Sequence, residues 1–582
     1  MGLGKKSVRI NGADCGVEAI FLGVVTSIGG FLFGYDTGQI SGMLLFSDFK
    51  NRFGQEDTPE GRDFTPIIES LVVSLMSIGT LVGALTSSYT ADWLGRRKSL
   101  AVGCLIFILG CVIQMTAMHS WVHIMMGRFV AGLGIGNLSV GVPMFQSECA
   151  PREIRGAVVA SYQLLITFGI LVANCVNYGA REIQDKDASW RIVIGIGIPF
   201  AGLLFLGLFM VPESPRWLAA RERWEAARVS LARLRGMKDE PEHELVENDM
   251  QEMRQSLEKE KTVGVGTWKE CFVPQENGVP KQVYRTFLGI AIHFLQQWTG
   301  VNFFFYYGAS IFESAGIDDP IRTQLILGAI NVGSTFVGLW VVERFGRRMP
   351  LVIGAAWQAV WLAVFASMGT ALDPENNQTS GIVMIVAAAL FIASFAITWG
   401  PICWVVIGET FPLRTRAKQA SIATAGNWLG NFMISFLTPL ATAGISYSYG
   451  FVFAGTNVVA GIIVWFFLYE SRSLSLEHVD EMYADPRATP RNSKAWIPDG
   501  YISRKHKDPH HEKSGHGIDG GVAAHHSEDV DDRTTAVPSG RPSRADERGY
   551  GRDSGVLEKQ DSGEERLVAG RDERDERVRR AV

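Results

Sequence analysis

Several amide and charged side chains lie within long apolar stretches of the sequence, where a polar group is costly unless it has a partner. Gln296, Gln297 and Asn302 fall in one such stretch, and Asp36 and Arg128 fall in two others. An amide donates and accepts hydrogen bonds without carrying charge, so a set of amides suits a neutral ligand with several hydroxyl groups. A buried acid and a buried arginine suit an ion pair or a proton site. These residues are the first candidates for function.

The three amides do not share one face of an unbroken helix. Gln296 and Asn302 are six residues apart, which places them about 240° apart around a regular helix. A break at Thr299-Gly300 is therefore needed to bring the two side chains together.

A second group of candidates consists of acidic residues and arginines that recur at nearly constant spacing. An acidic-x-x-Gly-Arg-Arg motif recurs after 251 residues, a Glu-x-x-Pro-x-x-x-Arg motif after 261, and a Glu-Ser pair after 257. Three matches in the same order indicate two homologous halves of the same orientation. We expect ion pairs that hold the halves together on one side of the membrane and break in the opposite conformation; the alternative is that the arginines only fix orientation. The residues are Asp92, Arg96, Arg97, Glu148, Arg155 and Glu213, and then Glu343, Arg347, Arg348, Glu409, Arg416 and Glu470.

The composition indicates a membrane protein with a polar tail. Of the 582 residues, 47% are hydrophobic and the mean hydropathy is +0.12, although 43 of the 112 residues in 471–582 are charged. This pattern disfavours a soluble enzyme, and a net charge of −5 without a basic domain disfavours a nucleic-acid binder. The seven Cys show no CxxC spacing, so we expect neither a metal nor another cofactor.

Twelve apolar runs are long enough to cross a hydrocarbon layer of ~30 Å as helices. Short loops on one side carry eleven Lys and Arg residues and loops on the other carry six, so we expect both termini and the central polar stretch to be cytoplasmic. The sequon at Asn377 falls in an expected external loop and is a glycosylation candidate. The runs lie at 17–40, 67–91, 99–118, 121–144, 155–179, 191–211, 284–312, 321–342, 349–371, 381–408, 419–442 and 449–469.

These runs divide the chain into five expected parts. The last part contains too few apolar residues to form a core, so we predict that it is disordered. The parts are a cytoplasmic N-terminus (1–16), a first six-helix half (17–211), a cytoplasmic linker with amphipathic helices (212–283), a second six-helix half (284–470) and a cytoplasmic tail (471–582).

Six segments together carry a family signature. They are GGFLFGYDTGQISG (29–42), GRFVAGLGIG (127–136), PESPRWL (212–218), QQWTGVNFFFYYG (296–308), VERFGRR (342–348) and WGPICWVVIGETFPLRTRAK (399–418). The combination resembles the sugar-porter family of the major facilitator superfamily, and looks most like its fungal hexose transporters. The resemblance implies an all-α major facilitator fold with twelve transmembrane helices in two pseudo-symmetric halves. It also implies alternating access and uptake of a monosaccharide, usually glucose, at the plasma membrane.

The same resemblance implies a set of sugar-contacting residues, each of which has the expected amide or aromatic type here. Ala396 stands where some facilitators hold a carboxylate, and no Lys or Arg belongs to the set, which favours a neutral sugar. Ser88, Trp93 and Gln39 depart from the usual family pattern. The implied contacts are Gln163, Gln296, Gln297, Asn302, Asn331, Trp404, Asn427 and Phe33.

The pair Asp36 and Arg128 leaves the mode of transport open. In proton-coupled sugar porters the corresponding aspartate is the protonation site and the arginine tunes it, whereas many fungal facilitators keep the same aspartate. Facilitated diffusion and proton symport therefore both remain. A glucose sensor that signals through its long tail is the alternative function, and the tail could bind regulatory or ubiquitin-linked proteins.

Overall fold

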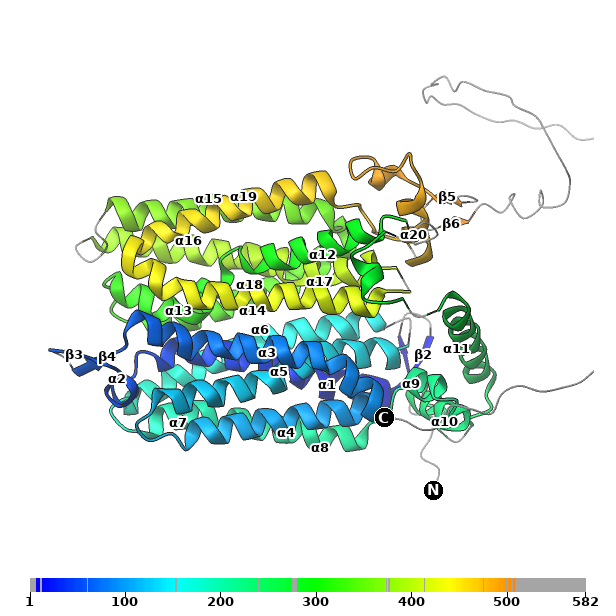
Figure 1. The fold of residues 1–582 in the computed structure, drawn as a ribbon, viewed down its shortest axis with the longest axis horizontal. Helices are drawn as coiled ribbons and strands as arrows, with labels where there is room; N and C mark the ends of the chain where they lie inside the picture. Colours follow the sequence, from blue (N-terminus) through cyan, green and yellow to red (C-terminus); the bar gives the residue numbers. More distant parts are fainter. Residues whose placement is uncertain are drawn as a thin grey trace, which may run out of the picture. The chain divides into compact units, whose positions relative to one another are not determined.

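The structure is a computed structural model that describes residues 7–10, 13–59, 61–151, 154–238, 240–264, 266–274, 280–372, 374, 377–412, 414–474, 476–498, 501–503 and 506–507. It is mainly helical (Figure 1), because in a bilayer a long apolar run satisfies its own backbone hydrogen bonds as a helix. The described strands form three antiparallel pairs: β1 (Ser7–Ile10) with β2 (Ala13–Gly16), β3 (Glu56–Thr58) with β4 (Gly61–Asp63), and β5 (Tyr501–Ser503) with β6 (His506–Lys507).

The first half contains six membrane crossings, the last of which is made by two consecutive short helices. A short helix α2 (Ser47–Phe53) and the turn η1 (Arg181–Ile183) lie between crossings. The crossings are α1 (Val17–Met43), α3 (Pro66–Leu94), α4 (Arg96–Met115), α5 (Trp121–Cys149), α6 (Arg155–Ala180), and α7 (Ala188–Gly195) with α8 (Gly197–Met210).

The second half repeats this plan with two interrupted crossings. These are α12 (Gln282–Gln297) with α13 (Val301–Ser314), and α16 (Gln378–Ile397) with α17 (Trp399–Thr410). The uninterrupted crossings are α14 (Pro320–Phe345), α15 (Arg348–Ala371), α18 (Arg416–Ile445) and α19 (Tyr449–Phe467), with the turn η3 (Ser446–Ser448) between the last two.

The number of crossings agrees with the twelve expected from the sequence. Within the described residues, ten helical stretches are long and apolar enough to cross a membrane. One of them, 50 residues long, contains both α18 and α19, and the interrupted α12–α13 crossing is not among the ten. Adding these two gives twelve crossings.

Smaller elements mark the two ends of the helices, which we call the linker end and the far end. The linker end carries α9 (Pro215–Ala220), α10 (Trp224–Leu234), α11 (Glu244–Val263) and η2 (Lys269–Cys271), and the far end carries α2 with β3 and β4 (Figure 1). Helices α9 to α11 share a small apolar core that includes Leu218, Ala227 and Met250.

The chain after residue 470 is ordered further than the sequence predicts. Helix α20 (Leu476–Ala484) and the turn η4 (Ser493–Ala495) pack at the linker end. Tyr469, Met482, Tyr483 and Trp496 meet in an apolar cluster there. The prediction of disorder is therefore wrong for the described part of 471–498, because these apolar residues bury one another. The rest of the predicted disordered tail, from residue 508, lies outside the described residues.

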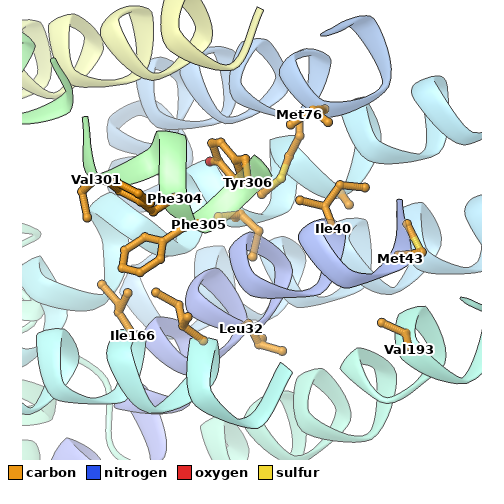
Figure 2. Close-up of a cluster of buried hydrophobic side chains, with 14 of the residues drawn as sticks. Leu32, Ile40, Met43, Met76, Ile166, Val193, Val301, Phe304, Phe305 and Tyr306 are labelled. Carbon is orange, nitrogen blue, oxygen red and sulfur yellow. The ribbon is translucent and has the colours of Figure 1, made fainter. Parts of the chain in front are cut away.

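A continuous apolar core joins the two halves. Helix α13 of the second half packs against α1 of the first, α14 against α6, and α18 against α3. Figure 2 shows Phe305 and Tyr306 of α13 among Ile40, Met76 and Ile166 of the first half. Residues from both halves thus meet at the centre, where the candidate site lies.

Candidate functional site

Four amide side chains of the second half form one hydrogen-bonded group, which we call the amide cluster: Gln296, Gln297, Asn302 and Asn427. Nε2 of Gln297 donates to Oδ1 of Asn427 at 2.8 Å, and Nδ2 of Asn427 donates to Oε1 of Gln296 at 2.7 Å. Nδ2 of Asn302 donates to Oε1 of Gln297 at 2.5 Å. The four side chains are buried. The structure thus brings together half of the residues implied as sugar contacts.

The break between α12 and α13 is what allows Asn302 to reach the glutamines. Gly300 has a φ of +96°, which favours glycine, and its backbone starts α13 in a new direction. The amide of Asn457 donates to the freed Thr299 carbonyl at 2.9 Å. Gln296 in turn donates to the Gly400 carbonyl at 3.1 Å, at the second interrupted crossing. The sequence prediction of a break at Thr299-Gly300 is confirmed.

Aromatic side chains border the amide cluster from both halves. Trp404 of α17 is half-buried and meets the ring of His293 edge to face, with centroids 4.7 Å apart. Phe33 of α1 meets the ring of Trp428, with centroids 5.1 Å apart. Trp428 directly follows Asn427 in α18, so this contact brings the first half next to the amide cluster.

The other implied contacts are not joined to the amide cluster by any described hydrogen bond. Gln163 of α6 is half-buried. Asn331 of α14 is buried, and its backbone carbonyl accepts from Thr335 at 2.8 Å. Ala396 is buried on α16, so no carboxylate occupies that position. Gln163 and Asn331 remain predictions as sugar contacts.

Asp36 and Arg128 face each other in the first half, as expected. Oδ2 of Asp36 lies 3.9 Å from Nη2 of Arg128, and both side chains are buried. Oδ1 of Asp36 accepts from Nε2 of Gln39 at 2.6 Å, and Nη2 of Arg128 contacts the sulfur of Met76 at 3.3 Å. Nε and Nη1 of Arg128 have no hydrogen-bond partner in the described part of the chain. The hydrogen-bonding capacity of the two charged groups is therefore only partly met. Gln39 adds a polar contact that the usual family pattern lacks.

The repeated acids and arginines form a network at the linker end of the first half. Arg96 binds Glu148 at 2.9 Å and Asp92 at 3.0 Å. Oε1 of Glu213 accepts from the backbone N–H groups of Arg96 and Arg97, at 3.0 and 3.1 Å. Both N–H groups lie at the start of α4, where a helix favours a carboxylate.

The second half repeats this network almost atom for atom. Arg347 binds Glu409 at 2.6 Å, and Glu470 accepts from the backbone N–H groups of Arg347 and Arg348, at 3.1 and 3.0 Å. Glu343, the counterpart of Asp92, is exposed and makes no ion pair among the described residues.

Two glycines let these carboxylates approach the helix starts. Gly95 has a φ of +93°, and an added Cβ would lie 2.6 Å from a carboxylate oxygen of Glu213. Gly346 has a φ of +87°, and an added Cβ would lie 2.7 Å from a carboxylate oxygen of Glu470. Only glycine fits either position without displacing the carboxylate.

The contacts just described differ from the expected ones in one respect. The sequence hypothesis has these residues hold the two halves to each other, whereas the first network described here joins the first half to the start of the linker, and the second closes within the second half. The side chain of Arg155 lies outside the described residues. Arg416 donates to the Phe411 carbonyl at 3.1 Å, also within its half. The ion pairs described here therefore connect helices of the same half. Their role as latches between the halves stays a prediction.

An ion pair between the halves lies at the far end instead, while hydrogen bonds join them elsewhere, such as the one from Ser77 to Asn431 at 3.0 Å. The guanidinium of Arg181, after α6, pairs with Asp319, before α14. Partial burial is the largest single influence and acts to raise the pKa of Asp319. The hydrogen bonds from Arg181 and from the Arg322 backbone, with the charges of these two arginines, together outweigh burial and hold that pKa below its usual value. Asn174 of α6 donates to the Gln324 carbonyl at 3.1 Å. The halves are thus tied at the far end in this structure.

The linker is tied to the second half by a carboxylate. Glu270 pairs with Arg414 at 3.1 Å, and it accepts from the backbone and hydroxyl of Thr267. The hydrogen bonds from Thr267 and the charge of Arg414 hold the pKa of Glu270 below its usual value. This carboxylate is therefore ionised at neutral pH.

Sequence reasoning missed two residues beside the amide cluster. Trp428 is buried against Phe33, and His293 is buried against Trp404. The available signals were a tryptophan directly after Asn427 and a histidine one helical turn before Gln296. No cluster of three metal-ligating side chains occurs in the part of the chain that the structure describes.

Two six-helix halves with interrupted helices around a buried polar cluster define a secondary transporter of the major facilitator type. Solved structures agree. The inward-open xylose transporter XylE from E. coli has a TM-score of 0.64 and 27% identity, covering 80% of this chain and 99% of its own. XylE bound to 6-bromo-6-deoxy-D-glucose, described as a proton:xylose symporter, has a TM-score of 0.66 and 27% identity with the same coverage.

The chain belongs to the family described as "Sugar (and other) transporter", which it matches over residues 22–483. It is 40% identical to the high-affinity glucose transporter ght5 of Schizosaccharomyces pombe, over 86% of this chain and 91% of the relative. It is also 40% identical to the low-affinity glucose transporter HXT3 of Saccharomyces cerevisiae, over 82% of this chain and 83% of the relative. The family and fold predicted from the sequence are confirmed.

Proposed function

We propose that this protein carries a neutral monosaccharide, with glucose or another hexose as the first candidate, across the membrane by alternating access, and that the sugar binds at the amide cluster. The observation that carries this proposal is the cluster itself, four buried amides bonded to one another, with Trp404 against the neighbouring His293. The relatives described as glucose and fructose transporters support a hexose as the substrate.

The amides suit a sugar because their mutual hydrogen bonds can be exchanged for bonds to hydroxyls. Each hydroxyl donates and accepts, as each amide does, so the exchange leaves few polar groups unpaired. The face of Trp404 offers a plate for the apolar side of the sugar ring. No Lys or Arg hydrogen-bonds to the cluster among the described residues, so an anionic substrate would lack a counter-charge. Phe33, Gln163 and Asn331 would complete the site from other helices.

Uptake of labelled glucose tests the proposal, in cells that lack their own hexose carriers and with surface expression verified. We expect saturable uptake and, for Gln297→Ala, a KM at least about tenfold higher, since a buried sugar hydroxyl loses its partner. Absence of uptake by the correctly placed wild type would contradict hexose transport. An unchanged KM in a correctly placed Gln297→Ala variant would contradict the binding site.

The Asp36–Arg128 pair leaves facilitated diffusion and proton symport as the two modes. The neighbour described as a proton:xylose symporter supports symport, whereas Gln39 and Arg128 both give the Asp36 carboxylate a static partner. Asp36→Asn separates the two. Loss of net uptake with survival of sugar counterflow would establish proton coupling. Equal loss of net uptake and counterflow would exclude proton coupling through Asp36.

The remaining proposals concern placement and movement. The halves 17–211 and 284–470 would rock about the central site, with the linker end cytoplasmic and the protein in the plasma membrane. Asn377 would then be external, where its Oδ1 accepts from the Thr379 N–H at 3.1 Å and its nitrogen remains for a glycan. A mobility shift on glycosidase treatment that is absent from Asn377→Gln tests this orientation.

A further inference from the structure

The linker segment around η2, just before α12, carries a group of exposed apolar side chains. Its other side is buried, since Cys271 is 0% and Glu270 is 5% exposed. An exposed apolar patch with a defined direction indicates a surface that binds something other than water. We call this patch the η2 face; it consists of Trp268, Phe272 and Val273, which are 40%, 45% and 45% exposed, and the exposed Lys269.

Three contacts hold this segment against the outer side of two membrane-spanning helices. The hydroxyl of Thr286, in α12, donates to the Cys271 carbonyl at 2.8 Å. The N–H of Gly266 donates to the carbonyl of Arg414, just before α18, at 3.2 Å, and Glu270 pairs with Arg414 at 3.1 Å. The segment is therefore held at both ends, and the direction of the η2 face is fixed.

The depth of the η2 face in the bilayer follows from its contact with α12. Phe272 meets the ring of Phe287 edge to face, with centroids 6.2 Å apart. Phe287 is 57% exposed and lies inside the apolar run 284–312, five residues after α12 begins at Gln282. Five residues correspond to about 7 Å along a helix, which is about the thickness of one headgroup layer. The η2 face is therefore level with the boundary between headgroups and acyl chains.

We propose that the η2 face is a membrane anchor, which inserts at this boundary on the linker side of the bilayer and prefers anionic phospholipids. Aromatic side chains are favoured at the boundary. Lys269 would extend its ammonium group to the lipid phosphates while its methylene chain lies along apolar surface. Its positive charge favours an anionic headgroup over a zwitterionic one. Continuity with the lipid-exposed Phe287 favours lipid over a protein partner.

The anchor would connect the bilayer to the helix that carries two members of the amide cluster. The hydrogen bond between Thr286 and Cys271 joins η2 to α12, which ends with Gln296 and Gln297. Lipid bound at the η2 face would thus hold the start of α12 at a constant height in the membrane while the halves move. The anchor itself does not depend on which substrate the protein carries.

Quenching by nitroxide lipids tests the anchor in the full-length protein, reconstituted in vesicles. Cys15 and Cys175 are replaced by serine, since the other five cysteines are buried, and the fluorophore NBD is attached through Val273→Cys. The control is a label attached through Leu245→Cys, because Leu245 is 42% exposed on α11, which packs against α9 and α10. We expect phosphatidylcholine with a nitroxide near its headgroup to quench the label at 273 at least about fivefold more than the label at 245.

The same label measures the preference for anionic lipid. Quenching by nitroxide-labelled phosphatidylglycerol is compared with quenching by nitroxide-labelled phosphatidylcholine at equal content. We expect phosphatidylglycerol to be enriched about fivefold at the label, because Lys269 attracts its charge. Lys269→Gln should remove this enrichment, and Lys269→Arg, which keeps the charge, should retain it.

Each part of the proposal has its own contrary result. Equal quenching at positions 273 and 245 would overturn the anchor. A label at 273 with blue-shifted emission that no lipid quenches would also overturn it, by showing that protein covers the face. Equal quenching by the two lipids in the protein that keeps Lys269, or an enrichment that survives Lys269→Gln, would overturn the selection of anionic lipid by this lysine.

Discussion

The amide cluster of the second half and the ion pair of the first half are two ways of burying polar groups in a membrane protein. In the cluster, Gln296, Gln297, Asn302 and Asn427 bond to one another through short hydrogen bonds. In the ion pair, the charged atoms lie 3.9 Å apart and part of the guanidinium has no partner among the described residues. The difference teaches that neutral amides satisfy one another when buried, whereas the two buried charges leave part of their bonding capacity unmet. If transport is coupled to protons, the proposed sugar site and the proposed proton site would lie in different halves.

Removing one charge of the pair should have the largest effect. Arg128→Leu leaves the buried Asp36 carboxylate without its counter-charge, which we expect to lower the free energy of unfolding by about 3 kcal/mol. The double variant Asp36→Asn with Arg128→Leu should recover most of this loss, as measured by thermal melting in detergent. Additive losses in the double variant would show that the two side chains do not interact.

Removing the hub of the amide cluster should affect binding more than stability. Asn427→Ala breaks bonds to Gln296, Gln297 and the His293 carbonyl, and we expect a loss of about 2 kcal/mol in sugar binding, or a KM roughly thirtyfold higher. Gln114→Leu, which removes an amide that donates to a carbonyl of its own helix, is the control and should keep the wild-type KM. A similar KM for both variants would contradict the cluster as the binding site.

The two networks at the linker end allow a finer comparison between the halves. Glu148→Gln and Glu409→Gln should each slow maximal uptake several-fold with little change in KM, since each removes a charge-assisted bond of about 1–2 kcal/mol. The effect should be larger for Glu148, because its pair with Arg96 is 11% exposed on both sides, against 26% for Glu409. Conformational labelling and kinetics unchanged in both variants would exclude a gating role.

The smallest effect is expected at the far end, from Arg181 and Asp319. Because the pKa of Asp319 is lowered from its usual 3.8, its contribution to stability is present at neutral pH and is lost as the pH falls through the lowered value. The difference in melting temperature between wild type and Asp319→Asn should therefore be constant down to about pH 4 and shrink below it. A difference that grows on acidification would contradict this pairing.

The helices and the central amides were predictable because they depend on local signals. Long apolar runs give the crossings, and Gly300 gives the break that joins Asn302 to Gln297. The partners of Arg96 and Arg347 were predictable as residue types, but the sequence does not show whether a carboxylate belongs to the same half or the other. The docking of α20 was missed because charge dominates the tail composition, while a few apolar residues such as Tyr483 decide its packing. His293 was missed because a lone histidine in an apolar run gives no sign of whether its ring is paired.

The two glycines with positive φ have a consequence for genetics. At Gly95 and Gly346 even alanine would press against the carboxylate that holds a helix start. In a library of all single substitutions selected for growth on a transported sugar, no substitution at these two positions should survive the selection. Most lipid-facing positions of the same helices should tolerate many. The two positions should therefore appear as matched gaps, 251 residues apart, and reveal the internal duplication from fitness alone.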